Sequence, residues 1–296
     1  RTFHAHLVTD IAQCDKRFRS RSPSLFYQKE SHMDLTLSES QFNLVYNSFS
    51  FVIASMGAAL LFFLLARTRV APQHRMAVTL STLVVAIALY HYVRIFGSWE
   101  DAFSYAGGEY TQDGKPFNEG YRYVDWLLTV PLLLAELVVV LKLTQSKTRS
   151  LIVRLTIAAV AMIVLGYPGE ILDADDSMRT VWGVLSTIPF LYILYVLFAE
   201  LGKSLERQSD GVKKLVDALR YIILATWGIY PIAYMLPSLI DDDANAEVAR
   251  QVMYSIGDVL AKPLFGILVL GIALAKSRED GYIEPGTTPS ATSDHA

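Results

Sequence analysis

Seven long apolar stretches constrain this chain more than any other feature of its sequence. They cover roughly residues 42–66, 75–97, 121–142, 149–169, 178–201, 213–238 and 246–275. A helix that crosses a bilayer needs about 20 predominantly apolar residues, and each stretch has that length. Hydrophobic residues make up 52% of the chain and charged residues only 19%, whereas a soluble domain carries about 25% charged residues. The sequence therefore predicts an all-α membrane protein, a bundle of seven transmembrane helices.

The charges in the connections predict how these helices are oriented. Two connections, 67–75 and 142–154, carry only Lys and Arg as charged residues, whereas the connections at 98–120, 170–179 and 240–250 are rich in Asp and Glu. Short loops with an excess of Lys and Arg stay in the cytoplasm. We therefore expect the N-terminus outside and the C-terminus in the cytoplasm. The connection 98–120 also has an alternating pattern, which predicts a small hairpin.

The apolar stretches indicate a single seven-helix domain, which we place at residues 41–278. The segment 1–40 is polar at its start, begins with Arg1 and contains no apolar core of signal-peptide length. We expect it to be disordered or non-native. The tail 279–296 is rich in Gly, Pro, Ser and Thr, and we expect a disordered cytoplasmic terminus.

Composition excludes several classes of function. The net charge of −3 provides no basic surplus for nucleic-acid binding. The single cysteine, Cys14, excludes an internal disulfide framework and any multi-cysteine metal site. The chain contains no Gly-rich phosphate loop, HExxH or GxSxG motif and no separate catalytic domain. We therefore expect neither an enzyme nor a metal centre.

The third apolar stretch carries ionisable residues at positions where they are costly. A charged side chain at the bilayer centre costs roughly 2.5–3.5 kcal/mol, so each is a candidate functional residue. Asp125 and Glu136 are eleven residues apart, which separates them by only about 20° around a helix and about 16 Å along it. Thr129 lies on the same stripe, and Arg122 lies one turn outward of Asp125. This stripe has the geometry of a proton relay.

The seventh stretch contains a second such pair, Asp258 and Lys262, four residues apart on one helical face. Lys262 lies too far from either end of the stretch to extend its amine to the membrane surface. It therefore needs a counter-ion or a covalent modification. One interpretation is a Schiff base between Lys262 and a carbonyl cofactor; the alternative is a structural Lys–Asp pair in a transporter.

Several motifs together resemble the proteorhodopsin-type microbial rhodopsins. The string from Arg122 to Leu133, with Glu136, resembles their third helix, and Asp258–Lys262 is similar to their retinal-binding helix. Trp227–Pro231 resembles the retinal wall of the sixth helix. Ser186–Thr187 and the following residues 191–198 resemble the fifth helix. The resemblance covers about residues 42–276.

The resemblance implies a role for each ionisable residue near Lys262. Lys262 would hold all-trans retinal as a protonated Schiff base. Asp125 would be the main counter-ion and the proton acceptor, and Asp258 the second counter-ion. Arg122 would keep both acids ionised, and Tyr92 would contact Asp258.

Three further assignments follow from the same resemblance. Glu136 matches the cytoplasmic proton donor and is expected to stay protonated until it reprotonates the Schiff base. His91 matches the histidine that hydrogen-bonds the acceptor aspartate; without the resemblance it would be an ordinary packing residue. Arg250 stands where some archaeal pumps place a proton-release glutamate, so early proton release is in doubt.

The resemblance also implies a retinal pocket, although the same aromatic side chains would otherwise be assigned to the core. Leu133 occupies the position that tunes colour, and an apolar residue there indicates green absorption. The expected pocket consists of Trp126, Leu133, Met162, Gly166, Ser186, Trp227, Tyr230, Pro231 and Tyr234.

Gly183 indicates a particular branch of the family. Glycine stands there where many relatives carry a large aromatic residue, and the resulting slot is used in the xanthorhodopsin-like branch to hold a carotenoid antenna. The motif Gly166–Glu170 also resembles that branch. The alternative is that Gly183 only allows close helix packing.

The resulting hypothesis is a light-driven outward proton pump in a prokaryotic inner membrane, surrounded by lipid and forming a homo-oligomer. Asp125 argues against a chloride pump, which needs that carboxylate removed. The Asp–Thr–Glu set on the third helix differs from the Asn–Asp–Gln set of sodium pumps. A sensory rhodopsin is the main alternative, and Glu136 favours pumping over it.

Overall fold

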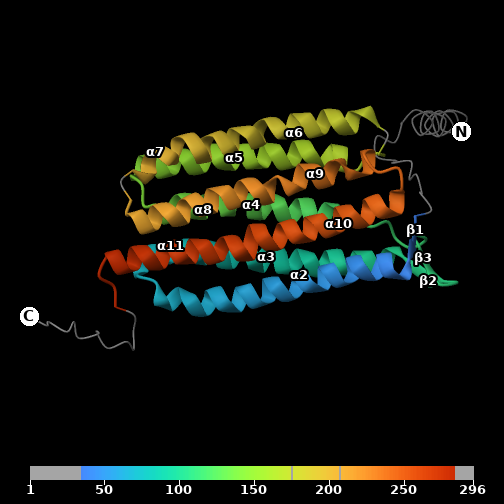
Figure 1. Ribbon diagram of the computed structural model, residues 1–296, viewed down its shortest axis with the longest axis horizontal. Helices are drawn as coiled ribbons and strands as arrows, with labels where there is room; N and C mark the ends of the chain where they lie inside the picture. The colour runs from blue at the N-terminus through green and yellow to red at the C-terminus, as the bar shows by residue number, and fades with distance from the viewer. Residues whose placement is uncertain (1–34, 175, 207, 284–296) are drawn as a thin grey trace, which may run out of the picture. The chain divides into compact units, whose positions relative to one another are not determined.

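The computed structural model describes residues 35–174, 176–206 and 208–283. Within these residues, seven helical segments are long and apolar enough to cross a membrane, which confirms the predicted all-α seven-helix bundle. Figure 1 shows the helices running side by side, with three short strands gathered at one end. The terminal segments 1–34 and 284–296 lie outside the described residues, so the predictions for them stay predictions.

Four spans are single helices: α2 (Glu39–Ala66), α3 (Arg75–Ala102), α4 (Gly120–Val140) and α5 (Gln145–Glu170). The fifth joins α6 (Ser177–Tyr195) to a π-helical segment, Val196–Glu200, and the short helix α7 (Gly202–Leu205) follows. The sixth consists of α8 (Asp210–Trp227), α9 (Ile229–Met235) and a 3₁₀ turn, Leu236–Ser238. The seventh consists of α10 (Asp243–Val259), a π-helical segment, Leu260–Leu264, and α11 (Phe265–Glu279). Two further 3₁₀ turns, Arg67–Arg69 and Pro72–His74, connect α2 to α3.

Polar caps explain why several helices begin before the apolar stretches do. Ser38 forms a capping box at α2, in which its hydroxyl accepts from the Gln41 amide (3.3 Å) and its own amide donates to the Gln41 side chain (2.9 Å). Ser209 and Asp242 accept from backbone amides at the starts of α8 and α10. Because such caps satisfy first-turn amides that have no helical partner, these helices begin at 39, 210 and 243 rather than at 42, 213 and 246.

The predicted hairpin in the 98–120 connection is present. Strands β2 (Ser104–Ala106) and β3 (Glu109–Thr111) pair antiparallel around Gly107 and Gly108, both of which have positive φ angles. Glycine adopts this backbone conformation without steric cost. A third strand, β1 (Thr36–Ser38), pairs with the other edge of β3 and leads directly into α2. The described fold therefore begins inside the segment 1–40 that the sequence assigned to the N-terminal region.

The bundle is apolar on its outer faces and carries ionisable groups inside. Large apolar side chains such as Leu65 and Ile188 are 76% and 61% exposed, whereas Asp125, Glu136 and Asp258 are 0% exposed. This distribution fits a lipid environment, in which polar groups are directed to the bundle interior. The interior charges lie mainly on α4 and on the seventh span.

Two interruptions of helical geometry lie beside these charges. The π-helical segment Leu260–Leu264 contains both Lys262 and Pro263, and π-helical turns occur frequently at functional sites. The sixth span is divided at Gly228 between α8 and α9, just before Tyr230 and Pro231. Helix α4 also contains a proline, Pro131, between Asp125 and Glu136. Two of the interruptions therefore lie at the predicted site, whereas the π-helical segment Val196–Glu200 does not line the cavity that Lys262 lines.

Candidate functional site

Lys262 lies between two carboxylates in the interior of the bundle. Its Nζ donates to Asp125 Oδ2 on α4 (2.6 Å) and to Asp258 Oδ1 on α10 (2.7 Å). The lysine side chain is 1% exposed, and both carboxylates are 0% exposed. Buried charges are tolerated only when they are paired and hydrogen-bonded, and this triad meets both conditions. The structure therefore brings together the three residues that the sequence predicted to form the centre of the site.

Asp258 accepts hydrogen bonds from three further side chains. Tyr92 OH donates to its Oδ2 (2.7 Å), as the sequence predicted. Tyr230 OH (2.7 Å) and Trp126 Nε1 (3.2 Å) donate to its Oδ1. These donors come from α3, α9 and α4, so Asp258 is held from three sides. A carboxylate with this many donors is stabilised in its ionised form.

Asp125 has fewer partners than Asp258. Its Oδ1 has no hydrogen-bond partner in the part of the chain that the structure describes. His91, predicted to hydrogen-bond this carboxylate, has its Nδ1 3.9 Å from Oδ1, which is too long for a hydrogen bond. The same nitrogen lies 2.9 Å from the Ile87 carbonyl oxygen, a helical neighbour that satisfies it locally. Thr129 donates to the backbone carbonyl of Asp125 (2.8 Å), not to its carboxylate.

Arg122 reaches the triad indirectly. Its guanidinium donates to Tyr92 OH (3.1 Å), to Gln251 Oε1 (2.5 Å) and to Glu119 Oε2 (3.5 Å). Tyr92 in turn donates to Asp258, so the phenol connects the two charges. The predicted influence of Arg122 on the acids therefore acts on Asp258 through Tyr92 and through space.

Glu136 is isolated on the other side of Asp125 along α4. Its side chain is fully buried, and neither carboxyl oxygen has a hydrogen-bond partner among the described residues. The hydroxyl of Ser81 on α3 is the polar group that approaches it. Since an unpaired charge in apolar surroundings is costly, these surroundings accommodate the neutral acid best. This agrees with the expected behaviour of a proton donor.

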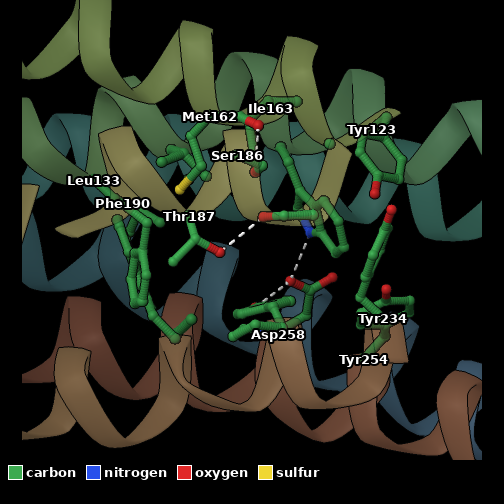
Figure 2. Close-up of a pocket in the computed structure, with 18 of the residues that line it drawn as sticks. Tyr123, Leu133, Met162, Ile163, Ser186, Thr187, Phe190, Tyr234, Tyr254 and Asp258 are labelled. Atoms are coloured by element: carbon green, nitrogen blue, oxygen red, sulfur yellow. Dashed lines mark hydrogen bonds between the residues drawn. The ribbon is translucent and has the colours of Figure 1, made fainter. Parts of the chain in front are cut away.

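Lys262 lines an apolar cavity with a volume of about 120 Å³. Figure 2 shows three tyrosines at one end and Leu133, Met162 and Phe190 at the other. The predicted pocket residues that line it are Trp126, Leu133, Met162, Gly166, Gly183, Ser186, Trp227, Tyr230, Pro231 and Tyr234. Residues that the sequence analysis did not predict are Tyr123, Val130, Ile163, Thr187, Phe190, Tyr254 and Ala261.

These residues fit a long conjugated aldehyde such as retinal. The amine of Lys262 lies on an otherwise apolar, aromatic cavity, which suits covalent attachment of an apolar chain. Two carboxylates flank this amine, and one oxygen, Asp125 Oδ1, is left to accept a proton. The chain therefore offers an attachment point, a hydrocarbon wall and counter-ions in one place.

Gly183 lies against the ring of Tyr234. A Cβ atom at Gly183 would be 2.9 Å from Tyr234 Cε1, and one at Gly169 would collide with the Tyr234 hydroxyl. That hydroxyl donates to the Arg179 carbonyl oxygen (2.7 Å). The two glycines thus make room for Tyr234, which agrees with the close-packing alternative. The slot for a carotenoid stays a prediction.

A second charged cluster lies at the end of the bundle near Glu119, and sequence reasoning missed it. Arg250 donates to Glu170 (2.7 Å), Glu119 (3.2 Å) and Glu247 (2.5 Å). Gln251 donates to Glu119 and Glu247 and accepts from Arg122. A signal for part of this cluster was available, because Gln251 and Tyr254 precede Asp258 by seven and four residues and so share its helical face.

Comparison with known proteins gives the family. Residues 43–276 match the family model described as bacteriorhodopsin-like protein. A green-light absorbing proteorhodopsin from a gamma-proteobacterium is 31% identical over 233 residues, covering 78% of this chain and 86% of the relative. Bacteriorhodopsin of Halobacterium salinarum is 31% identical over 245 residues, covering 81% and 88%.

Two solved structures are more similar in sequence. Thermophilic rhodopsin superposes with a TM-score of 0.81 at 50% identity, covering 84% of this chain and all of that one. Xanthorhodopsin, described as a light-driven ion pump with dual chromophore, superposes with a TM-score of 0.79 at 49% identity, with the same coverage.

The chain belongs to the bacteriorhodopsin-like family and is a type 1 microbial rhodopsin. Its seven spans and prokaryotic relatives also make it an integral membrane protein of a prokaryotic cell. The family implies a retinal chromophore and light-driven ion pumping.

Proposed function

We propose that this protein is a light-driven outward proton pump that binds all-trans retinal covalently at Lys262. The observation that carries the proposal is the position of Lys262 between Asp125 and Asp258, on a cavity walled by aromatic side chains. The similarity to proteorhodopsin and to xanthorhodopsin, a light-driven ion pump, supports it.

Lys262 would hold retinal as a protonated Schiff base, and the bound chromophore would supply the light-driven isomerisation that starts proton transfer. Asp125 is the acceptor of the proton in this proposal, because its Oδ1 is free of other donors. Asp258 already accepts from Tyr92, Tyr230 and Trp126. Its four donors, Lys262 included, keep it ionised, so it acts as a fixed counter-ion.

Glu136 is the proton donor in the same scheme. It lies eleven residues beyond Asp125, about 16 Å along α4 by helical rise, and on the same face. Its apolar surroundings favour the protonated acid until Glu136 reprotonates the nitrogen of Lys262. The two carboxylates therefore act on opposite sides of Lys262, which is the arrangement required for transport in one direction.

The outward direction depends on the orientation of the chain. The Lys- and Arg-rich connections predict that the Glu136 end of α4 faces the cytoplasm. A proton taken up at Glu136 and released beyond Asp125 would then leave the cell. A sensory rhodopsin, or a pump of another ion, is the alternative.

We further propose that a carotenoid binds beside Gly183 as a light-harvesting antenna. The description of xanthorhodopsin as having a dual chromophore supports this proposal. In a pigment with added carotenoid, Gly183→Trp should abolish energy transfer from the carotenoid to retinal. Transfer that survives the substitution would refute a site at Gly183.

The pump itself is tested by illuminating cells that express the chain with all-trans retinal in weakly buffered medium. External acidification in light, abolished by a protonophore, is the expected result. A coloured protein without a pH change would refute pumping of protons and favour a photosensor or another ion. Replacing sodium or chloride in the medium would then separate those alternatives.

A further inference from the structure

Glu170 is a buried carboxylate that the pumping scheme does not use. It is the last residue of α5, and its side chain is 0% exposed. Its Oε1 accepts from Arg250 Nη1 on α10 (2.7 Å). Without such a partner a buried carboxylate would be strongly disfavoured. The pairing explains how Glu170 is tolerated, but it does not explain what Glu170 does.

The other oxygen of Glu170 binds two phenols. Tyr123 OH (3.2 Å) and Tyr254 OH (3.3 Å) both donate to Oε2. These tyrosines come from α4 and α10, and both line the same cavity as Lys262. Figure 2 shows them at the same end of the cavity. Glu170 thus lies outside the cavity and fixes two aromatic rings of the cavity wall, those of Tyr123 and Tyr254.

Both rings pack against Trp126. Ring centroids are 5.1 Å apart for Tyr123 and 5.2 Å apart for Tyr254, at interplanar angles of 57° and 78°. Trp126 Nε1 in turn donates to Asp258 (3.2 Å). A continuous series of contacts therefore leads from Glu170, through either tyrosine, to the indole and then to Asp258.

We propose that Glu170 is a positioning residue for the counter-ions of Lys262. It holds Tyr123 and Tyr254 by their hydroxyls, and these rings hold Trp126 in the orientation that keeps Asp258 hydrogen-bonded. This inference rests on the proposed function, since it assigns Glu170 a role in tuning the same charged site. Its acceptor oxygen, rather than its charge, carries the effect.

The charge needs separate treatment because other ionised groups surround Glu170. Glu119 faces it from the residue before α4, and Arg250 on α10, which also pairs with Glu119 and Glu247, bonds it directly. Arg179 on α6 donates to the backbone carbonyl of Glu170 (3.3 Å), and the phenol of Tyr234 on α9 lies nearby. A test must therefore remove the charge and the acceptor independently.

Two substitutions do this in the full chain reconstituted with all-trans retinal. Glu170→Gln removes the charge but keeps an oxygen that can accept from the phenols, whereas Glu170→Met removes both. The readout is the pH midpoint at which the visible band shifts as the counter-ions are protonated. Only in Glu170→Met does Asp258 lose the well-oriented Trp126 donor. The pH midpoint of Glu170→Met should therefore lie above that of Glu170→Gln by about half to one pH unit, the effect of one hydrogen bond. Equal midpoints in the two variants would overturn the inference.

Tyr254→Phe provides a second test that leaves Glu170 and all charges intact. It should raise the midpoint in the native background and have little further effect in the Glu170→Met background, because the two changes break the same connection. Fully additive shifts would contradict the proposal. If Glu170→Met does not fold, Tyr254→Phe alone still decides. A Tyr254→Phe protein with the native pH midpoint would overturn the inference.

Glu200 offers a matched control. It pairs with Arg154 (2.6 Å) and connects the fifth span to α5, as Glu170 connects α5 to α10, but its bonding partner Arg154, unlike the tyrosines bonded to Glu170, does not line the cavity. Glu200→Gln and Glu200→Met should give the native midpoint. A native protein that forms no coloured pigment would refute the proposed function itself. A native pigment that titrates normally, with variants identical to it, would refute only the role of Glu170.

Discussion

The two halves of α4 place similar carboxylic acids in opposite surroundings. Around Asp125, Lys262 lies within 2.6 Å and Asp258 contributes a second, heavily hydrogen-bonded charge. Around Glu136, neither carboxyl oxygen has a hydrogen-bond partner among the described residues, and the Ser81 hydroxyl is the polar group that approaches it. Both acids are completely buried. Burial alone therefore does not define a role; the partners do.

This contrast teaches how one helix can supply both an acceptor and a donor. Enzymes assign acid and base roles by pushing the proton affinities of two groups apart through their environments. Here the ion pair stabilises charge at Asp125, and the absence of partners stabilises the neutral form of Glu136. Substitutions at Asp125 and its partners should therefore have different effects on proton transfer from substitutions at Glu136.

The largest effect is expected from Lys262→Ala, which removes the attachment point for retinal and the cation that pairs with Asp125. No visible absorption band should form on addition of all-trans retinal, as measured by absorption spectroscopy. Lys276→Met is the matched control, because Lys276 is also a buried lysine of the seventh span but pairs with Gln208 (2.6 Å) away from the cavity. A coloured Lys262→Ala protein would rule out covalent attachment there.

Asp125→Asn should abolish pumping while the pigment still forms. Neutralising the carboxylate removes the acceptor and reduces the stabilisation of positive charge at Lys262, so the band should move to the red. Light-driven pH changes and the visible spectrum test the two expectations together. Undiminished pumping would transfer the acceptor role to another group.

Glu136→Gln should leave the first proton transfer intact and slow the recovery. General acid–base groups contribute about 10²–10⁴-fold to rates, and we expect a slowing of about 100-fold in decay of the deprotonated state by flash photolysis. A small membrane-permeant weak acid should restore the rate by delivering protons directly. A photocycle identical to the native one would remove Glu136 from the donor role.

His91→Gln should have the smallest effect of these changes. Its Nδ1 is 3.9 Å from Asp125 Oδ1 and bonded to the Ile87 carbonyl. Its influence on Asp125 is therefore through space, and the pH midpoint of the colour change should move by less than about one unit. A larger shift would mean that His91 bonds Asp125 directly in the pigment.

The sequence predicts the spans and the α4 stripe well because both depend on one-dimensional spacing. Apolar runs of fixed length identify the helices, and an eleven-residue separation places Asp125 and Glu136 on one face. The pair Asp258 and Lys262 is recognisable for the same reason. Their convergence with Asp125, however, depends on how two distant helices pack.

Other parts of the site depend on pairings that no local pattern encodes. Glu170 and Arg250 are eighty residues apart in sequence, so their contact requires the packed bundle. The position of Tyr234 against Gly183 depends on a side-chain orientation, so the sequence alone leaves both a carotenoid slot and close packing open at Gly183. The distance of His91 from Asp125 likewise depends on whether its ring nitrogen bonds the Ile87 carbonyl or the Asp125 carboxylate.

The ion pairs of Lys262 also bear on how the pigment assembles. The ammonium form that Asp125 and Asp258 favour is not nucleophilic, so Lys262 must give up a proton before it can attack the carbonyl carbon of an aldehyde. Asp125 Oδ2, which already accepts a hydrogen bond from Nζ (2.6 Å), is placed to receive it. In the proposed scheme, chromophore uptake in darkness thus begins with a transfer between the same two side chains that later exchange a proton in light.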